Sequence, residues 1–597
     1  MSRKIHLTLE RARSGQPTLC VRVDGTQHWI HSPRDPEAEA KVLVDQWWQG
    51  PGLYIVLGLG LGYHVSELER RLRATRGDIV VLEPVQEIYD IALSSGTLSA
   101  LVGGRKVQLY AGAQARQALQ ARDLLVESTS VFLRVHPVLH GLFREEYDTV
   151  LDSLRGEVNR QVVNANTLLF WDLLWLRNTI LNVPFLVSHP SGIHLQSRFK
   201  GVPAFIVAAG PSLDKNVREL KRAQGRSVIL VVDTALRSVL GAGITPDFIV
   251  AVDASPKNYE HFRGVSVDGI PLVFDPMVQP AILDNHKGAK VSVRTYNLVY
   301  EWLSCVLEKP LQLNAGGSVA TVALDFAVKL GCNPIVLVGQ DLAYDDQGRT
   351  HAADSVYGKD RVALDRSSLL TVPGIDGGEV WTSRGLYSFL VWFERYLEAA
   401  PSTLRVIDAT EGGARIRGTH VETLARTVDN ECRTNVSASA IMDEAFKEWT
   451  PVTTVRKVRQ FILDGAEALD NMACQARDGQ KHVKELRRLV QRNRLQSRQA
   501  AKLLRQLATL NSSLRAIQEE TQGIIHAALY RSILQAVRQD DAGTPAPQPG
   551  MYNPDVAVGL LSKSEQLYQA IESACRRTAS VIRESLPGDG YGEEMMM

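Results

Sequence analysis

Two short turns combine glycine with serine in front of predicted helices. Glycine lets the backbone approach a ligand closely, and serine can cap the helix that follows, whose N-terminus carries partial positive charge. Such turns suit a phosphate or the hydroxyl groups of a nucleotide. The residues concerned are Gly210, Pro211, Ser212 and Leu213 in the first turn, and Asn314, Gly316, Gly317 and Ser318 in the second.

Acidic residues stand at the ends of three predicted strands. Carboxylates in such positions can accept hydrogen bonds from ribose and base. The aspartates are Asp233, Asp253 and Asp341, and the neighbouring residues expected in the same site are Thr234, Gly339 and Gln340.

No two of these aspartates form an Asp-x-Asp pair, the usual divalent-metal anchor of sugar-nucleotide enzymes. We therefore expect no metal site. A departing phosphate would then need side-chain or backbone donors, and Tyr344, Arg349 and Tyr357 are the nearest in sequence.

Apolar stretches alternate with helical patterns through the middle of the chain, which favours a doubly wound parallel sheet. Ligands of such sheets bind at the carboxyl ends of the strands, so both turns and all three aspartates should share one edge. The predicted strands cover residues 203–209, 227–232, 246–252, 271–274, 290–293 and 334–338.

The amino-terminal part predicts a strand-rich lead-in and then a βαβ unit. Its first strand, 53–57, leads into the glycine loop Gly58–Gly62, and Glu83 follows the second strand, 78–82. The pattern is typical of Rossmann-like nucleotide-binding folds. A lone glycine loop also forms a plain strand-to-helix turn, and we favour that interpretation.

The carboxyl-terminal part predicts long helices over residues 436–539, a Pro- and Gly-rich linker over 541–553, and a last helix over 556–584. Residues 481–505 hold nine Lys or Arg and only one acidic residue, Glu485. This is either a solvated helix face or a docking surface for an acidic protein or anionic lipid.

The composition is that of an ordinary globular protein, with a formal net charge of +1, 22% charged and 45% hydrophobic residues. It indicates no nucleic-acid partner. The six cysteines lack disulfide or zinc spacing, and no apolar stretch reaches the length of a membrane span, so we expect a cytoplasmic protein. The predicted domains are 1–150 (Rossmann-like), 151–200 (helical connection), 201–433 (central domain) and 434–597 (helical).

Six ordered motifs resemble those of the motility-associated factor glycosyltransferases: residues 207–214, 232–236, 243–247, 314–319, 338–344 and 351–354. Those bacterial proteins are linked to flagellin glycosylation. The resemblance implies a Rossmann-like amino domain, a central transferase domain and a helical carboxyl domain. It also implies transfer of a pseudaminic or legionaminic type of nonulosonic acid from a CMP-activated donor to flagellin Ser or Thr hydroxyls, no further cofactor, and contact with the flagellar export machinery.

The central domain also resembles bacterial sialyltransferases, a GT-A-like variant fold. This resemblance implies that Gly210 to Leu213 and Asp253 face the nucleotide, Gly316 to Ser318 the phosphate or ribose, and Tyr344 the leaving phosphate. The wider family pattern also implies that Glu411, Gly412 and Gly413 line the same pocket.

The catalytic base is left open by the sequence. Sialyltransferases use a histidine later in the domain, and residues 381–384, where it would align, contain none. His351 and Asp341 are the candidates, since either side chain can take the proton of an acceptor hydroxyl.

Two other functions fit the sequence. Archaeal pterin diphosphokinases share the central domain and would use ATP with magnesium. A flagellin chaperone or scaffold without catalysis is the second alternative.

Overall fold

The computed structural model describes residues 5–23, 25–73, 77–98, 107–117, 131–151, 154, 173–295, 298–360, 369–494, 497–520 and 554–586. The chain divides into two compact units, Met1–Phe170 and Trp171–Met597. The predicted linker 541–553 and residues 155–172 of the predicted helical connection lie outside the described residues. The predicted four-part division of the chain stays a prediction.

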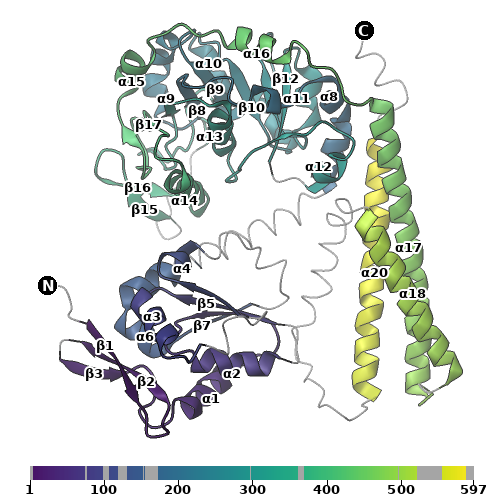
Figure 1. Ribbon diagram of the computed structural model, residues 1–597. Coiled ribbons are helices and arrows are strands. Elements are labelled where there is room, and N and C mark those ends of the chain that lie inside the picture. Colours follow the sequence, from purple (N-terminus) through teal and green to yellow (C-terminus); the bar gives the residue numbers. More distant parts are fainter. Residues whose placement is uncertain are drawn as a thin grey trace. The chain divides into compact units, whose positions relative to one another are not determined.

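The first unit joins a small antiparallel sheet to a parallel α/β layer (Figure 1). Strands β1 to β3 pair in chain order, and the parallel sheet has the order β6-β5-β4-β7. The predicted lead-in and βαβ unit are confirmed. The elements are β1 (Ile5–Arg11), β2 (Pro17–Val23), β3 (Thr26–Trp29), α1 (Pro36–Trp47), β4 (Leu53–Leu57), α2 (Tyr63–Leu72), β5 (Asp78–Glu83), α3 (Gln86–Ser94), β6 (Val107–Ala111), α4 (Ala113–Gln117), β7 (Val131–Val135) and α6 (Pro137–Leu142).

The glycine loop of this unit is closed by the protein's own side chains. Leu59 N donates to Glu83 Oε2 at 2.8 Å, and Leu61 N donates to His31 Nε2 at 2.7 Å. The N–H groups of Gly58, Gly60 and Gly62 are also engaged, by Leu82 O, the Glu83 carboxylate and Leu59 O. A ligand would find no free N–H group here, which favours the plain-turn interpretation.

The second unit is built on a nine-stranded parallel sheet of order β13-β12-β11-β10-β9-β8-β14-β17-β18. The predicted doubly wound α/β architecture is confirmed. The strands are β8 (Ala204–Val207), β9 (Val228–Val232), β10 (Phe248–Ala251), β11 (Leu272–Phe274), β12 (Lys290–Arg294), β13 (Leu311–Gln312), β14 (Ile335–Val338), β17 (Val406–Asp408) and β18 (His420–Val421).

Helices pack on this sheet through a continuous apolar core (Figure 1). Helix α13 contacts β8, β9, β10 and β14, and α14 packs beside it. A two-stranded hairpin, β15 (Leu370–Pro373) with β16 (Glu379–Thr382), precedes α14. The helices are α8 (Val183–Ser188), α9 (Leu213–Asn216), α10 (Leu236–Gly241), α11 (Pro280–Asn285), α12 (Leu298–Leu303), α13 (Val319–Leu330), α14 (Arg384–Ala399), α15 (Leu424–Glu431) and α16 (Ala438–Phe446), with the 3₁₀ turns η1 (Gly192–Leu195), η2 (Val217–Arg222), η3 (Asp233–Ala235) and η4 (Pro256–His261).

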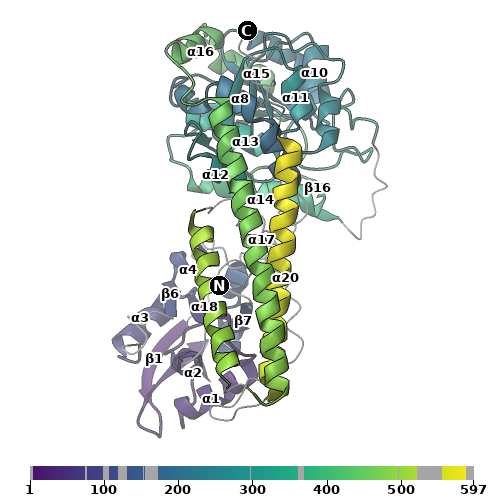
Figure 2. The same cartoon turned by 90° about the vertical axis from the view of Figure 1, so that its right-hand side faces the viewer.

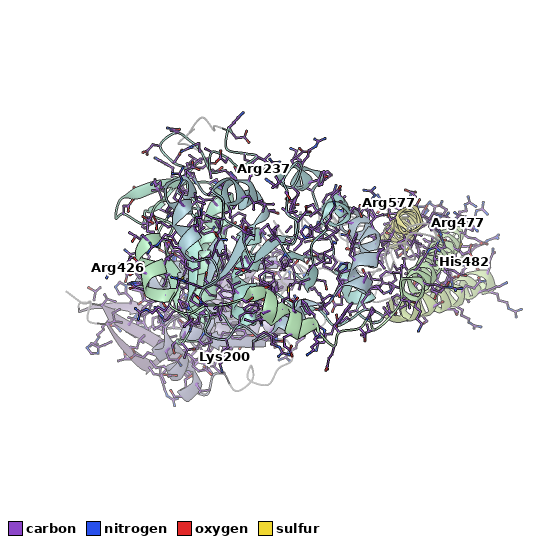
Figure 3. All side chains as sticks on the ribbon, turned by 90° about the horizontal axis from the view of Figure 1, so that it is seen from above. Lys200, Arg237, Arg426, Arg477, His482 and Arg577 are labelled. Atoms are coloured by element: carbon purple, nitrogen blue, oxygen red, sulfur yellow. The ribbon has the colours of Figure 1, made fainter. Side chains whose placement is uncertain are left out.

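Three long helices follow, which confirms the helical carboxyl region: α17 (Val455–Gln491), α18 (Arg498–Glu520) and α20 (Pro554–Ser585). They run side by side (Figure 2). Gly479 lets the ring of Tyr568 lie against α17, and Arg477, labelled in Figure 3, pairs with Glu572 at 2.8 Å.

No helix among the described residues is long and apolar enough to cross a membrane.

We expect Gly60→Ala to destabilise the first unit by about 2–3 kcal/mol, since positive φ strains alanine and its Cβ would overlap the ring of His31. The matched control is Gly96→Ala, which shares positive φ but whose Cβ would meet nothing within 4 Å. It should cost about 1 kcal/mol. Hydrogen exchange of peptides covering β4 and β5 measures the loss of protection in each variant. Equal losses in the two variants would show that overlap with the His31 ring does not destabilise the unit.

Candidate active site at the carboxyl edge of the central sheet

Strand order places a switch point between β8 and β14. From β8 the chain adds strands in one direction as far as β13, whereas β14, β17 and β18 continue in the other direction. Loops leaving the carboxyl ends of β8 and β14 therefore diverge to opposite faces of the sheet. Open α/β sheets bind their ligands at such points.

Asp341 ties the two diverging loops together. Its carboxylate accepts the N–H of Ser212 at 3.1 Å and the hydroxyl of Ser212 at 2.6 Å, while Gly210 N donates to Gly339 O at 2.8 Å. The side chain is only 6% exposed. Burial raises the pKa of Asp341 to about 6, against the lowering effect of the Ser212 hydrogen bonds.

The N–H groups of the first turn donate hydrogen bonds to acceptors within the protein itself. Ser212 donates to Asp341, and the N–H groups of Leu213 and Asp214 donate to Gly210 O and Pro211 O at 3.1 and 3.3 Å. The α9 helix that follows has only four residues. This turn therefore offers close packing to the site rather than the anion-binding N–H groups expected from the sequence.

Residues Glu411 to Gly413 pack against Asp341 and Ser212. Gly413 packs on the backbone of Asp341, and a Cβ on Gly412 would lie 3.1 Å from Ser212 Cβ. Glu411, at φ +58°, accepts Asn216 Nδ2 at 3.0 Å through its Oε1. The structure thus brings this predicted motif together with the first turn and the end of β14.

The second turn is the more open of the two. Among the described residues, no acceptor faces the N–H groups of Gly317, of the N-cap residue Ser318 and of Val319, the first residue of the twelve-residue α13. Asn314 N and Gly316 N are held by Asp325 Oδ2 and Thr321 Oγ1 at 2.8 and 2.9 Å. A free helix N-terminus of this kind suits an anion.

Helix α14 covers this turn with aromatic rings. A Cβ on Gly316 would overlap the ring of Trp392, and a Cβ on Gly317 would lie 3.1 Å from Phe389. The Tyr396 hydroxyl donates to Asp325 Oδ1 at 2.5 Å. Both glycines are needed because larger residues would displace these rings.

Asp233 and Asp253 follow neighbouring strands, β9 and β10, and interact electrostatically. Asp233 is 1% exposed and accepts the N–H of Thr234 at 2.8 Å through Oδ1. Burial raises the pKa of Asp233 to about 7. Asp253 is exposed and accepts the N–H of Ser255 at 2.8 Å.

The loop after β14 returns over the carboxyl edge. Ala352 N donates to Ala209 O at 2.7 Å, and Ala353 N donates to the Asp214 carboxylate at 3.1 Å, so the loop is fastened to the end of β8. Gln340 is buried, and its N–H donates to Thr410 Oγ1 at 3.3 Å. Tyr344 is half-buried, and its N–H donates to Trp381 O at 2.8 Å.

His351 is carried by this fastened loop. Its ring centroid lies 5.2 Å from that of Tyr357, and its Nδ1 lies 2.9 Å from Thr350 Oγ1. Burial lowers the pKa of His351. Arg349, expected as a phosphate donor, instead contacts Asp345 at 2.6 Å and Asp214 at 3.4 Å.

Sequence reasoning missed His261, at the end of η4. Its ring centroid lies 5.3 Å from that of Tyr357, so Tyr357 contacts two imidazoles, those of His261 and His351. Burial, with charge from His351 and Arg237, lowers the pKa of His261 to about 4. Its position shortly after the strand-end Asp253 was the available signal.

In the part of the chain that the structure describes, no three His, Cys, Asp or Glu side chains are grouped to hold a metal ion. Metal-independence remains a prediction.

The fold is similar to that of a solved glycosyltransferase. The structure of the Maf glycosyltransferase from Magnetospirillum magneticum AMB-1 matches 99% of this chain and 94% of its own, with a TM-score of 0.57 and 17% identity. The resemblance to the motility-associated factor proteins is thereby confirmed at the level of the fold.

The sequence relatives include three uncharacterized proteins of Treponema pallidum (strain Nichols). The first is 30% identical over 218 residues, which are 35% of this chain and 70% of the relative, and the chain belongs to one family with it. The others are 27% and 26% identical over 22% and 31% of this chain, and the matches span 55% and 40% of their lengths. Residues 177–347 also match the family model of 6-hydroxymethylpterin diphosphokinase MptE-like proteins.

We expect Gly210→Ala to destabilise the second unit by about 2–4 kcal/mol, because the added Cβ would overlap Asp341 Oδ2 and lie 2.5 Å from Gly339 O. Gly241→Ala is the control, since its φ is not positive and its Cβ would meet nothing within 4 Å. Hydrogen exchange of peptides from β8 and β14 measures the loss of protection in both variants. Unchanged protection in Gly210→Ala would show that the tie at Asp341 is not structural.

Proposed function

We propose that the chain is a glycosyltransferase that moves a nonulosonic acid of the pseudaminic or legionaminic type from its CMP-activated donor to Ser or Thr hydroxyls of flagellin. The observation that carries the proposal is the gathering of Asp233, Asp253, His351 and the open second turn at the carboxyl edge of a sheet with the Maf fold. The donor and acceptor follow from the resemblance of the motifs.

The phosphate of the donor is assigned to the second turn. The N–H groups of Gly317, Ser318 and Val319 lie at the N-terminus of α13, where the helix dipole stabilises negative charge. These donors would hold the CMP phosphate as negative charge develops on its oxygen during departure.

We assign the base to His351 rather than to Asp341. Both Asp341 oxygens receive hydrogen bonds from Ser212, and the carboxylate is buried beneath the glycine turns. His351 is half-buried, and burial holds its pKa below the ordinary value, so the imidazole is neutral at pH 7.

The proposed step is a substitution at the anomeric carbon. The acceptor oxygen forms a bond to that carbon as the bond to the phosphate oxygen breaks. The acceptor proton goes to the neutral imidazole of His351, and CMP leaves with the bonding electron pair.

Intact mass spectrometry of flagellin, incubated with the purified chain and a CMP-activated nonulosonic acid, tests the proposal. We expect one added sugar mass per modified site. His351→Asn should slow transfer at least about 100-fold, as loss of a general base does. His28→Asn, in the first unit on β3, is the control. Unmodified flagellin would contradict the function, and full activity of His351→Asn would contradict the base.

Diphosphoryl transfer to a pterin is the second candidate, favoured by the family-model match over residues 177–347. Thermal-shift measurements with CMP, CTP and ATP, with and without magnesium, separate the two. We expect CMP and CTP to raise the melting temperature without magnesium, because the open second turn offers phosphate-binding N–H groups. Stabilisation by ATP with magnesium alone, and indifference to the cytidine nucleotides, would favour the diphosphokinase.

A further inference from the structure

Among the residues that the structure describes, two buried polar atoms at the carboxyl ends of β9 and β10 and a third in the loop before Tyr357 stand without a hydrogen-bond partner at standard geometry. They are Asp233 Oδ2, which has the Asn258 side chain close by, His261 Nδ1 and Ser355 Oγ. Their side chains belong to residues that are 1%, 2% and 7% exposed. Buried polar atoms in proteins almost always have partners, so a group of unpartnered ones needs an explanation.

Tyr357 connects these residues in space. Its ring packs on His261, with centroids 5.3 Å apart, and Asp253 and Asp233 lie close enough to raise the pKa of its hydroxyl, after the larger effect of burial. Ser355 stands two residues before Tyr357, and its carbonyl accepts the N–H of Gly358 at 3.0 Å. Tyr357 therefore contacts His261, lies near Asp233 and follows Ser355 closely in the chain.

Hydrogen bonds from α10 to residues that flank His261 fix its position. Arg237, on α10 and labelled in Figure 3, donates through Nη2 to Glu260 O at 2.9 Å and to Arg263 O at 2.5 Å. Asn258 Nδ2 donates to Asp253 O at 3.3 Å. These contacts hold η4 against the ends of β9 and β10, so the unpartnered nitrogen is preorganised.

The chemistry of the three atoms selects the ligand group. A carboxylate oxygen accepts hydrogen bonds, a serine hydroxyl both donates and accepts, and a neutral imidazole nitrogen does one or the other. An ionised Asp233 would repel a phosphate. Adjacent hydroxyl groups, which donate and accept at once, complement all three.

We propose that His261, Asp233 and Ser355 together bind the ribose hydroxyls of the donor nucleotide, with His261 contacting them directly. This inference rests on the proposed function and divides the donor between two places. The ribose lies at the ends of β9 and β10, and the phosphate lies at the second turn.

Calorimetric titration of the full chain with CMP and with 2′,3′-dideoxy-CMP tests the inference. The wild type should bind CMP at least about tenfold more tightly than the dideoxy nucleotide, since hydrogen bonds to buried groups are lost with the hydroxyls. His261→Phe should weaken CMP binding about tenfold and reduce the preference for the hydroxyls. Ser355→Ala is a second, smaller change that serves if His261→Phe fails to fold.

His286→Phe is the matched control. His286 is 4% exposed and so is buried like His261, yet it precedes β12 and so lies at the opposite, amino edge of the parallel sheet. It should leave the CMP affinity and the preference for hydroxyls unchanged.

The outcomes distinguish this inference from the proposed function. If the wild type binds CMP, and the folded His261 and Ser355 variants keep both affinity and preference, the ribose assignment is overturned while the proposed function stands. If the wild type does not bind CMP, the cytidine-dependent function falls and the ribose assignment falls with it.

Discussion

The hydrogen bonds between Asp341 and Ser212 are the constraint on which the rest of the site depends. They join the loops that leave β8 and β14 at the switch point of the sheet. The approach is close enough that Gly210, Gly339 and Gly413 have no room for a side chain. The loop carrying His351 is then fastened to the end of β8, so the tie also fixes the proposed base.

The same residue pattern has two outcomes in this chain. In the first unit, the glycine loop after β4 is closed by Glu83 and His31, whose side chains accept its N–H groups. In the second unit, the turn before α13 keeps three N–H groups without acceptors among the described residues. Glycine spacing predicts the turn in each case, but the side chains that reach it from elsewhere decide whether a ligand has room.

Much of the fold was predictable because it depends on local pattern. Buried strands such as β9 and β14 are short apolar stretches bounded by turns, and the long helices carry an apolar stripe at helical spacing. The two-residue strands β13 and β18 were not predicted, because pairing with β12 and β17 defines them rather than any pattern of their own.

The site was less predictable, because its hydrogen bonds join residues far apart in sequence. Asp341 and Ser212 are separated by 129 positions, so the sequence could show a strand-end carboxylate but not that the first turn engages both its oxygens. His261 was missed for a related reason. Its importance depends on contact with the ring of Tyr357, which belongs to a loop far away in the sequence.

The most direct test of the account is a crystal structure of the chain with CMP bound. We expect the nucleotide at the carboxyl edge of the central sheet, with its phosphate at the N–H groups of Gly317 and Ser318. Its ribose should lie beside Asp233 and His261. Density for CMP at the Gly58–Gly62 loop of the first unit, and none at the central sheet, would contradict it.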